Sequence, residues 1–139
     1  MYGRLNLNEI NWLAVVAAAL STFIIGGFWY SPILFGGVWL RANGFTDAQV
    51  KNFNKARAFG GAFFLVLVMS ANLAMFLADS KTTLLWGMIA GALAGIGWVA
   101  AGFAVVALFE NRSWPYILVN GGYQVVAFVS MGAILGAWR

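Results

Sequence analysis

The sequence predicts an all-α integral membrane protein, in which four transmembrane helices form an up-down bundle with a short interfacial segment after the first helix. Its composition is one reason, because 63% of the 139 residues are hydrophobic and 9% are charged, against about 45–50% and about 25% in ordinary soluble domains. The distribution is the other, because every Asp, Glu, Lys and Arg falls outside four long apolar stretches. This composition excludes a soluble globular enzyme, a disordered tail and a disulfide-rich secreted domain.

The first span covers residues 11–30 and contains no charge. About 20 mostly apolar residues cross a bilayer as helix, and backbone groups in lipid must be satisfied within the segment, so helix is predicted rather than strand. Trp12 opens the span, while Trp29 and Tyr30 close it, as expected of interfacial aromatic residues. The apolar run is too long for a signal peptide and lacks a small-residue cleavage site at its end, so we expect it to be retained. Pro32 lacks a backbone donor and should end the helix.

Residues 31–57 form the one substantial link outside the spans. Within it, residues 33–40 are apolar but too few to cross a bilayer, which predicts an interfacial or re-entrant piece. Asn43 and Gly44 indicate a turn. Thr46 followed by Gln49 fits a capping box, in which each side chain satisfies a free N–H at the start of a helix. A helix beginning there is expected to run unbroken into the second span.

The second, third and fourth spans cover residues 58–78, 84–109 and 116–138. The links between them are short, so consecutive spans are expected to be antiparallel neighbours within a single domain, residues 1–139. Ser113 is a plausible cap for the last helix, and Pro115 suits its first turn.

The Lys and Arg residues predict the orientation, since they are enriched in cytoplasmic loops. We expect insertion in the cytoplasmic membrane with both termini outside the cytoplasm. Five Lys and Arg residues lie on the expected cytoplasmic side and three on the other, and this small difference leaves dual insertion open. The five cations are expected to contact anionic lipid headgroups, and a specific lipid or anionic-ligand site is the alternative. The expected cytoplasmic side carries Arg41, Lys51, Lys55, Arg57 and Arg112, and the other side carries Arg4, Lys81 and Arg139.

Glycines recur every four residues in the last two spans. In lipid, such a row lets another backbone approach closely, so that van der Waals contacts hold the helices together. The row predicts tight helix packing, and three interpretations stay open: packing within one chain, an interface between copies, or a permeation path lined by glycine backbone. The residues are Gly87, Gly91 and Gly95 in the third span, and Gly132 and Gly136 in the fourth.

Few polar residues lie inside the spans, and several fall at similar depth when each helix is placed about its own midpoint. One interpretation is interhelical hydrogen bonding that fixes packing, at about 0.6 kcal/mol per pair. The other is a polar layer that lines a small cavity or pore. The candidates for this layer are Ser21, Thr22, Asn72, Trp98, Asn120 and Gln124.

No catalytic residue, cofactor site or metal site is predicted, and we expect the protein not to be an enzyme. The chain has no His and no Cys, and its four acidic residues are scattered over separate extramembrane segments. Proton-coupled transport relies on ionisable groups within the spans, and these spans contain none. The basic charge balance is typical of headgroup contact, and no nucleic-acid partner is expected.

Several motifs resemble the small membrane proteins grouped as domain of unknown function 1761. The resemblance covers essentially the whole chain and implies a four-helix integral membrane protein. It implies no substrate, reaction or catalytic residue, but leads us to expect that the elbow Trp29–Tyr30–Ser31–Pro32 and residues 120–123 matter for fold or function. The similar segments are residues 11–15, 29–32, 34–36, 110–112, 120–123 and 131–138, together with Trp39.

These observations favour a non-enzymatic structural, lipid-interacting or accessory membrane protein. Its expected partners are membrane lipids and further copies of itself, held together as a homo-oligomer through the glycine-rich faces. The alternative is a small oligomeric channel or facilitator for a neutral solute or a small ion, which would use the polar layer.

Overall fold

The computed structural model describes residues 7–139, and the regular structure in this range is helical throughout. Within it, four helical stretches are long and apolar enough to cross a membrane, and they coincide with the four predicted spans. Arg4, which contributes to the charge count, lies outside the described residues. The four stretches are Trp12–Trp29, Lys55–Phe76, Leu84–Phe109 and Trp114–Ala137.

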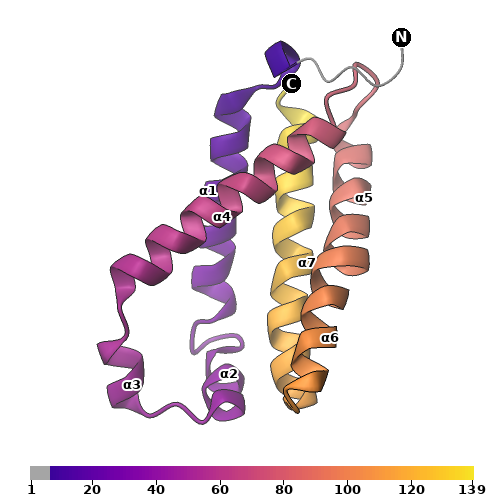
Figure 1. The fold of residues 1–139 in the computed structure, drawn as a ribbon. Helices are drawn as coiled ribbons and strands as arrows, with labels where there is room; N and C mark the ends of the chain where they lie inside the picture. Colours follow the sequence, from indigo (N-terminus) through magenta and orange to yellow (C-terminus); the bar gives the residue numbers. More distant parts are fainter. Residues whose placement is uncertain (1–6) are drawn as a thin grey trace.

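The third stretch is divided by a π-helical turn, and three short helices lie outside the long ones. In order, the elements are η1 (Leu7–Glu9), α1 (Trp12–Trp29), α2 (Gly36–Asn43), α3 (Asp47–Asn52), α4 (Lys55–Phe76), α5 (Leu84–Ala94), the π-helical η2 (Gly95–Ala100), α6 (Ala101–Phe109) and α7 (Trp114–Ala137). Figure 1 shows η1, the α4–α5 link and the end of α7 at one end of the molecule, with α2, α3 and the α6–α7 link at the other.

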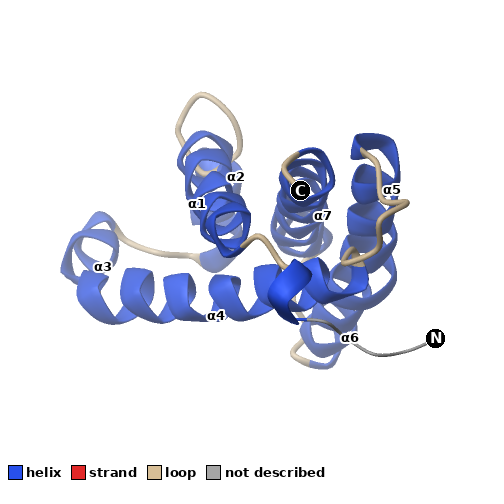
Figure 2. Ribbon diagram, turned by 90° about the horizontal axis from the view of Figure 1, so that it is seen from above, coloured by secondary structure: helices blue, strands red, loops and turns tan. Residues whose placement is uncertain are grey.

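Helix α7 is central. α1 packs against one side of it and the α5–η2–α6 stretch against another, while α4 crosses the face of α1 and α7 at an incline (Figure 1 and Figure 2). α4 packs mainly on α1 and α7, although only a short link joins it to α5. The expectation that consecutive spans are packing neighbours therefore fails for α4 and α5, because the incline carries α4 across α1.

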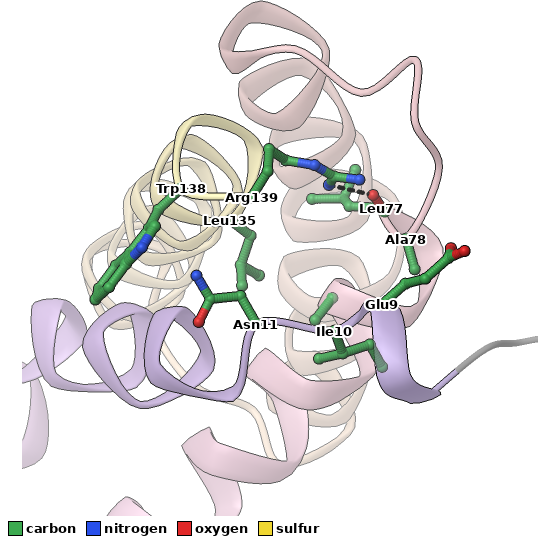
Figure 3. A pocket seen from close by; sticks show the side chains of 9 residues that line it. Glu9, Ile10, Asn11, Leu77, Ala78, Leu135, Trp138 and Arg139 are labelled. Carbon is green, nitrogen blue, oxygen red and sulfur yellow. Dashed lines mark hydrogen bonds between the residues drawn. The ribbon is translucent and has the colours of Figure 1, made fainter.

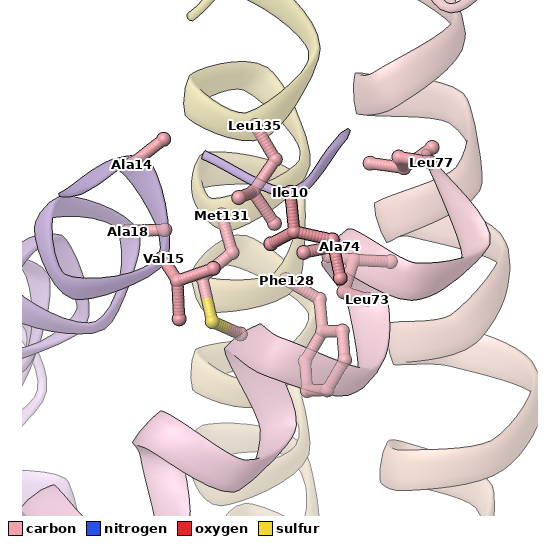
Figure 4. Packing of buried hydrophobic residues seen from close by; sticks show 10 residues of the cluster. All are labelled: Ile10, Ala14, Val15, Ala18, Leu73, Ala74, Leu77, Phe128, Met131 and Leu135. Carbon is pink, nitrogen blue, oxygen red and sulfur yellow. The ribbon is translucent and has the colours of Figure 1, made fainter. Parts of the chain in front are cut away.

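The buried core lies where α1, α4 and α7 meet (Figure 4). Small side chains at the crossing let α4 approach α1 closely, and the fully buried Ser70 donates its hydroxyl to the carbonyl oxygen of Val15 at 2.8 Å. Because that hydroxyl is satisfied across the interface, the hydrogen bond offsets the cost of removing the hydroxyl from water. The core residues are Ile10, Ala14, Val15, Ala18, Leu73, Ala74, Leu77, Phe128, Met131 and Leu135.

The link between α1 and α4 confirms two predictions and corrects one. Gly44 ends α2 with φ +67°, the left-handed conformation that glycine adopts freely. Thr46 and Gln49 form the predicted capping box at the start of α3. The helix does not run on into α4, however, because Phe53 is extended and the Asn54 side chain accepts from the N–H of Arg57, starting a new helix.

The π turn shifts which residues face α7. The N–H of Ala101 donates to the carbonyl oxygen of Ile96, five residues back, as in a π-helix. Before the turn, α5 faces α7 with glycines four residues apart. After it, the next residue that faces α7 is Ala100, which lies beside Gly121. Ala100 follows Gly95 by five residues instead of four, so the residues that face α7 are shifted by one along the chain. Trp98 is consequently turned outward and is 70% exposed.

Candidate functional site

The elbow after α1 is held against the first half of α7 by side-chain hydrogen bonds. The indole N–H of Trp29 donates to the carbonyl oxygen of Val119 at 2.9 Å, and the Tyr30 hydroxyl donates to Oδ1 of Asn120 at 2.7 Å. Asn120 in turn donates to the carbonyl oxygen of Tyr116 at 2.9 Å. Residues 29–32 and 120–123 were singled out separately in the sequence, and the structure places them in contact.

Aromatic rings extend this contact towards α2 and α3. Tyr30 meets Tyr123 and Trp39 edge-on, with ring centroids 5.4 Å and 5.7 Å away. Trp39 meets Phe45 at 5.3 Å, and Trp29 meets Phe35 at 4.7 Å. Such pairs add stabilisation beyond the apolar area that they bury. We call these six rings the elbow cluster: Trp29, Tyr30, Phe35, Trp39, Phe45 and Tyr123.

The turn beneath this cluster is tight, and glycine makes it possible. A Cβ atom on the buried Gly36 would lie 2.5 Å from the carbonyl oxygen of Tyr30 and 2.7 Å from that of Ser31. The hydroxyl of Ser31 donates to the carbonyl oxygen of Phe28 at 2.6 Å, and Pro32 is exposed beside it. Ser31 and Pro32 therefore shape the backbone of the elbow, while Trp29 and Tyr30 attach it to α7.

The five cations expected to contact headgroups lie on α2, α3, the first turn of α4 and the α6–α7 link. Among residues 7–139, the one ion pair joins Arg112 to Glu110 at 3.9 Å. The guanidinium group of Arg112 also lies over the Tyr116 ring, 4.5 Å from its centroid. The other four cations are exposed and unpaired within the described residues: Arg41, Lys51, Lys55 and Arg57.

Two hollows lie among these elements. One, of about 400 Å³, is formed by α2, the turn after it and α3, and is almost wholly apolar apart from Gln49. The other, of about 340 Å³, lies between α2 and the start of α7 and carries Arg41 at its edge, beside Ser113 and Pro115. The first is lined by Trp39, Phe45, Gln49, Val50 and Phe53.

Ser21 and Thr22 lie in the contact between α1 and α7. The hydroxyl of Ser130 donates to Oγ of Ser21 at 2.9 Å, and the Tyr123 hydroxyl donates to the carbonyl oxygen of Thr22 at 3.0 Å. The hydroxyl of Thr22 donates within its own helix, and the residue is 1% exposed. These groups fix the packing of two helices, and the partners on α7 were not identified from the sequence as belonging to one interface.

Asn72 and Trp98 lie elsewhere, in a groove of about 280 Å³ between α4 and η2. The rings of Phe76 and Trp98 are 6.2 Å apart there. Four of the lining residues, Phe76 and Trp98 among them, also line a neighbouring apolar hollow of about 400 Å³ that reaches Trp86. Asn72 is exposed, and its amide donates to the carbonyl oxygen of Val68 in its own helix at 3.0 Å.

The six candidates for the polar layer are therefore not gathered around one cavity. Asn120 belongs to the elbow, and the half-buried Gln124 lies on α7 beside Gly95. Ser21 and Thr22 are in a packed interface, while Asn72 and Trp98 line an outer groove. The depth of each residue was readable from the sequence, but its direction around the helix axis was not.

The five glycines of the predicted packing face lie between α5 and α7. A Cβ atom on Gly87 would lie 2.2 Å from the carbonyl oxygen of Gly132, and one on Gly132 would lie 2.0 Å from that of Gly87. A Cβ atom on Gly91 would lie 2.2 Å from the carbonyl oxygen of Phe128, whereas the nearest atoms are 2.6 Å away for Gly136 and 3.0 Å for Gly95. Because these faces are covered within the chain, they do not carry the expected homo-oligomer, which would need another surface.

Arg139 makes a contact that the sequence did not reveal. Its guanidinium group donates to the carbonyl oxygens of Leu77 and Asp79, which follow α4, and so ties the end of α7 to the α4–α5 link (Figure 3). A cavity of about 20 Å³ lies beside it. Basic side chains often satisfy carbonyls at helix ends, but nothing in the spacing connects residues 60 positions apart.

Within residues 7–139, no cluster of three or more His, Cys, Asp or Glu residues could hold a metal ion.

The family model described as "Protein of unknown function (DUF1761)" matches residues 13–136. No curated protein and no solved structure matches the chain.

Proposed function

Because the chain belongs to DUF1761, a family of unknown function, we propose a function from its own geometry: a non-enzymatic integral membrane protein that binds anionic lipid headgroups. The binding end is the one formed by α2, α3 and the α6–α7 link, together with the first turn of α4, which follows α3 and lies above it in Figure 1. We refer to it as the basic end.

The outer surface supports insertion into a bilayer. Large apolar side chains lie exposed on every long helix, such as Ile24 on α1 at 64%, Phe64 on α4 at 65% and Leu118 on α7 at 68%. Continuous exposed apolar surface of this kind marks a membrane or protein contact. Lipid chains would cover most of it.

One observation carries the lipid-binding proposal: exposed, unpaired cations stand beside the elbow cluster at the same end. Trp and Tyr favour the membrane–water boundary. Each Lys or Arg near an anionic membrane surface gains about 1 kcal/mol. Because no ion pair engages Lys51, Lys55 or Arg57 among residues 7–139, their charge is available for phosphate groups.

The elbow supplies the rigidity that such a site needs. The hydrogen bonds of Trp29 and Tyr30 attach the chain leading into α2 to α7, the central helix. α2 and its Arg41 are thereby held at a fixed depth relative to the long helices. The apolar hollow beside Trp39 offers a place for the upper part of an acyl chain below the headgroup.

The test compares the melting temperature of the purified protein in neutral detergent after addition of phosphatidylglycerol or phosphatidylcholine. We expect phosphatidylglycerol to raise the melting temperature more, and the difference to shrink at high salt because the charges are screened. The variant Lys51→Gln/Lys55→Gln/Arg57→Gln should lose most of the difference, while Lys81→Gln, at the other end, should keep it. An equal response to both lipids, or an unchanged difference in the triple variant, would contradict the proposal.

A further inference from the structure

Helix α4 presents a second, mostly apolar stripe that residues 7–139 leave exposed. Its inner face packs through Ser70, Leu73 and Ala74, which are buried. On the outside, exposed residues recur three or four positions apart, which places them on one face of the helix where a second helix can pack. This outer seam comprises Gly61, Leu65, Val68, Asn72 and Phe76.

The seam is open and shaped for close contact. Leu65 is 60% exposed, Val68 44% and Phe76 70%. A Cβ atom on Gly61 would meet nothing within 4 Å, so another helix can approach the backbone there. The groove that holds Asn72 runs alongside, with the exposed ring of Trp98 at its edge.

Asn72 decides what covers the seam. A carboxamide has two N–H donors and an oxygen acceptor, and among residues 7–139 only one donor is used, within its own helix. Acyl chains offer no hydrogen-bonding group, so lipid alone would leave the remaining donor and the oxygen unsatisfied in an apolar medium, at a cost in free energy. The occupant must therefore carry a donor and an acceptor at this depth.

We propose that a second copy of this chain docks on the seam, α4 against α4, with the two Asn72 side chains hydrogen-bonded to each other. A two-fold interface brings the same residue of both copies together, and a carboxamide is complementary to itself because it both donates and accepts. A single Asn in such a seam also fixes the register of the two helices. The homodimer surface is thus α4, and not the glycine faces, and this inference rests on the proposed membrane insertion but not on the headgroup site.

The chain has no cysteine, so single-cysteine variants test the seam directly by mild oxidation in native membranes. Val68→Cys leaves Asn72 in place and should form a disulfide-linked dimer. Ser70→Cys is the matched control, because Ser70 is on the same helix, is fully buried and faces α1. Adding Asn72→Leu to Val68→Cys should lower the association constant about threefold or more, whereas Asn72→Gln should retain most of it.

Thermal melting in detergent confirms that each variant is folded before its cross-linking is measured. Absence of a dimer from folded Val68→Cys would overturn the proposal, and so would equal cross-linking of Ser70→Cys. Cross-linking that is unaffected by Asn72→Leu would refute the role of the carboxamide. Labelling of the seam by a photoactivatable phosphatidylcholine, with no dimer formed, would assign the surface to lipid instead.

Discussion

At the scale of single residues, glycine sets the distance between α5 and α7. Gly87 and Gly132 each leave no room for a side chain, because the first atom of one would overlap a backbone carbonyl of the facing helix. Backbone cannot swing aside as a flexible side chain can, so the overlap would separate the helices. The four-residue spacing identified these positions in the sequence, but not which helix they would face.

We expect Gly132→Ala to lower the free energy of unfolding by about 3 kcal/mol, at the upper end of the usual cost of overpacking. Gly102→Ala is the control, since a Cβ atom there meets nothing within 4 Å. That change should be neutral or stabilising by up to about 1 kcal/mol, because alanine is the better helix former. Reversible unfolding by sodium dodecyl sulfate in mixed micelles measures both. Equal effects would show that α5 and α7 do not meet at the glycines.

The polar residues show what single positions in the sequence reveal and what they do not. Their depth follows from counting residues along each span. Their partners depend on how each helix is rotated, and here Tyr30 reaches Asn120 while Asn72 points to an outer groove. A polar layer inferred from depth alone therefore combined residues from separate places.

At the scale of elements, local signals in the sequence located helix starts well. Thr46 and Ser113 cap helices as predicted, because a cap depends on residues only three positions away. The break between α3 and α4 was missed, although Asn54 is a good N-cap residue type and offered a signal. The long apolar stretch that follows Asn54 favours a continuous helix, and that expectation was wrong here.

The π turn is an element that no sequence pattern indicated. Its consequence is physical: the extra residue keeps Ala100 and Ala107 towards the core, whereas a regular helix would turn other side chains there. Deleting Gly97 should remove the extra residue and restore a regular helix, and α6 should keep the same face towards α7. Deleting Gly102 from α6 instead should rotate the residues after it by about 100°, one residue of an α-helix, and Ala107, 3% exposed, would then leave the core.

Cysteine reactivity measures that rotation, since Ala107→Cys introduces the one thiol in the chain. We expect this thiol to react slowly with a small maleimide in the full-length chain and when Gly97 is deleted, and several times faster when Gly102 is deleted. Deleting one residue from the α4–α5 link, such as Ser80, controls for shortening the chain and should leave the reactivity low. An equal rise in reactivity on deletion of Gly97 and of Gly102 would mean that the π turn does not absorb an extra residue.

At the scale of the whole molecule, the four apolar stretches were predictable because the bilayer requires their length and composition. The incline of α4 was not. It results from the fit of small buried residues such as Ser70 and Ala74 against α1, which is a match between distant segments. That incline leaves the groove beside α5 open and the outer seam of α4 uncovered, and both features follow from packing rather than from any local pattern.

One proposed placement unites these proposals: four spans in the cytoplasmic membrane, with the basic end on the cytoplasmic side and the α4–α5 link on the other. The absence of cysteine allows a direct measurement with a membrane-impermeant maleimide on intact cells. Ala48→Cys on α3 and Ser80→Cys in the link are both at exposed positions. We expect Ser80→Cys to be labelled on intact cells and Ala48→Cys only after permeabilisation. Labelling of Ala48→Cys on intact cells, or of neither variant until the membrane is opened, would contradict this placement.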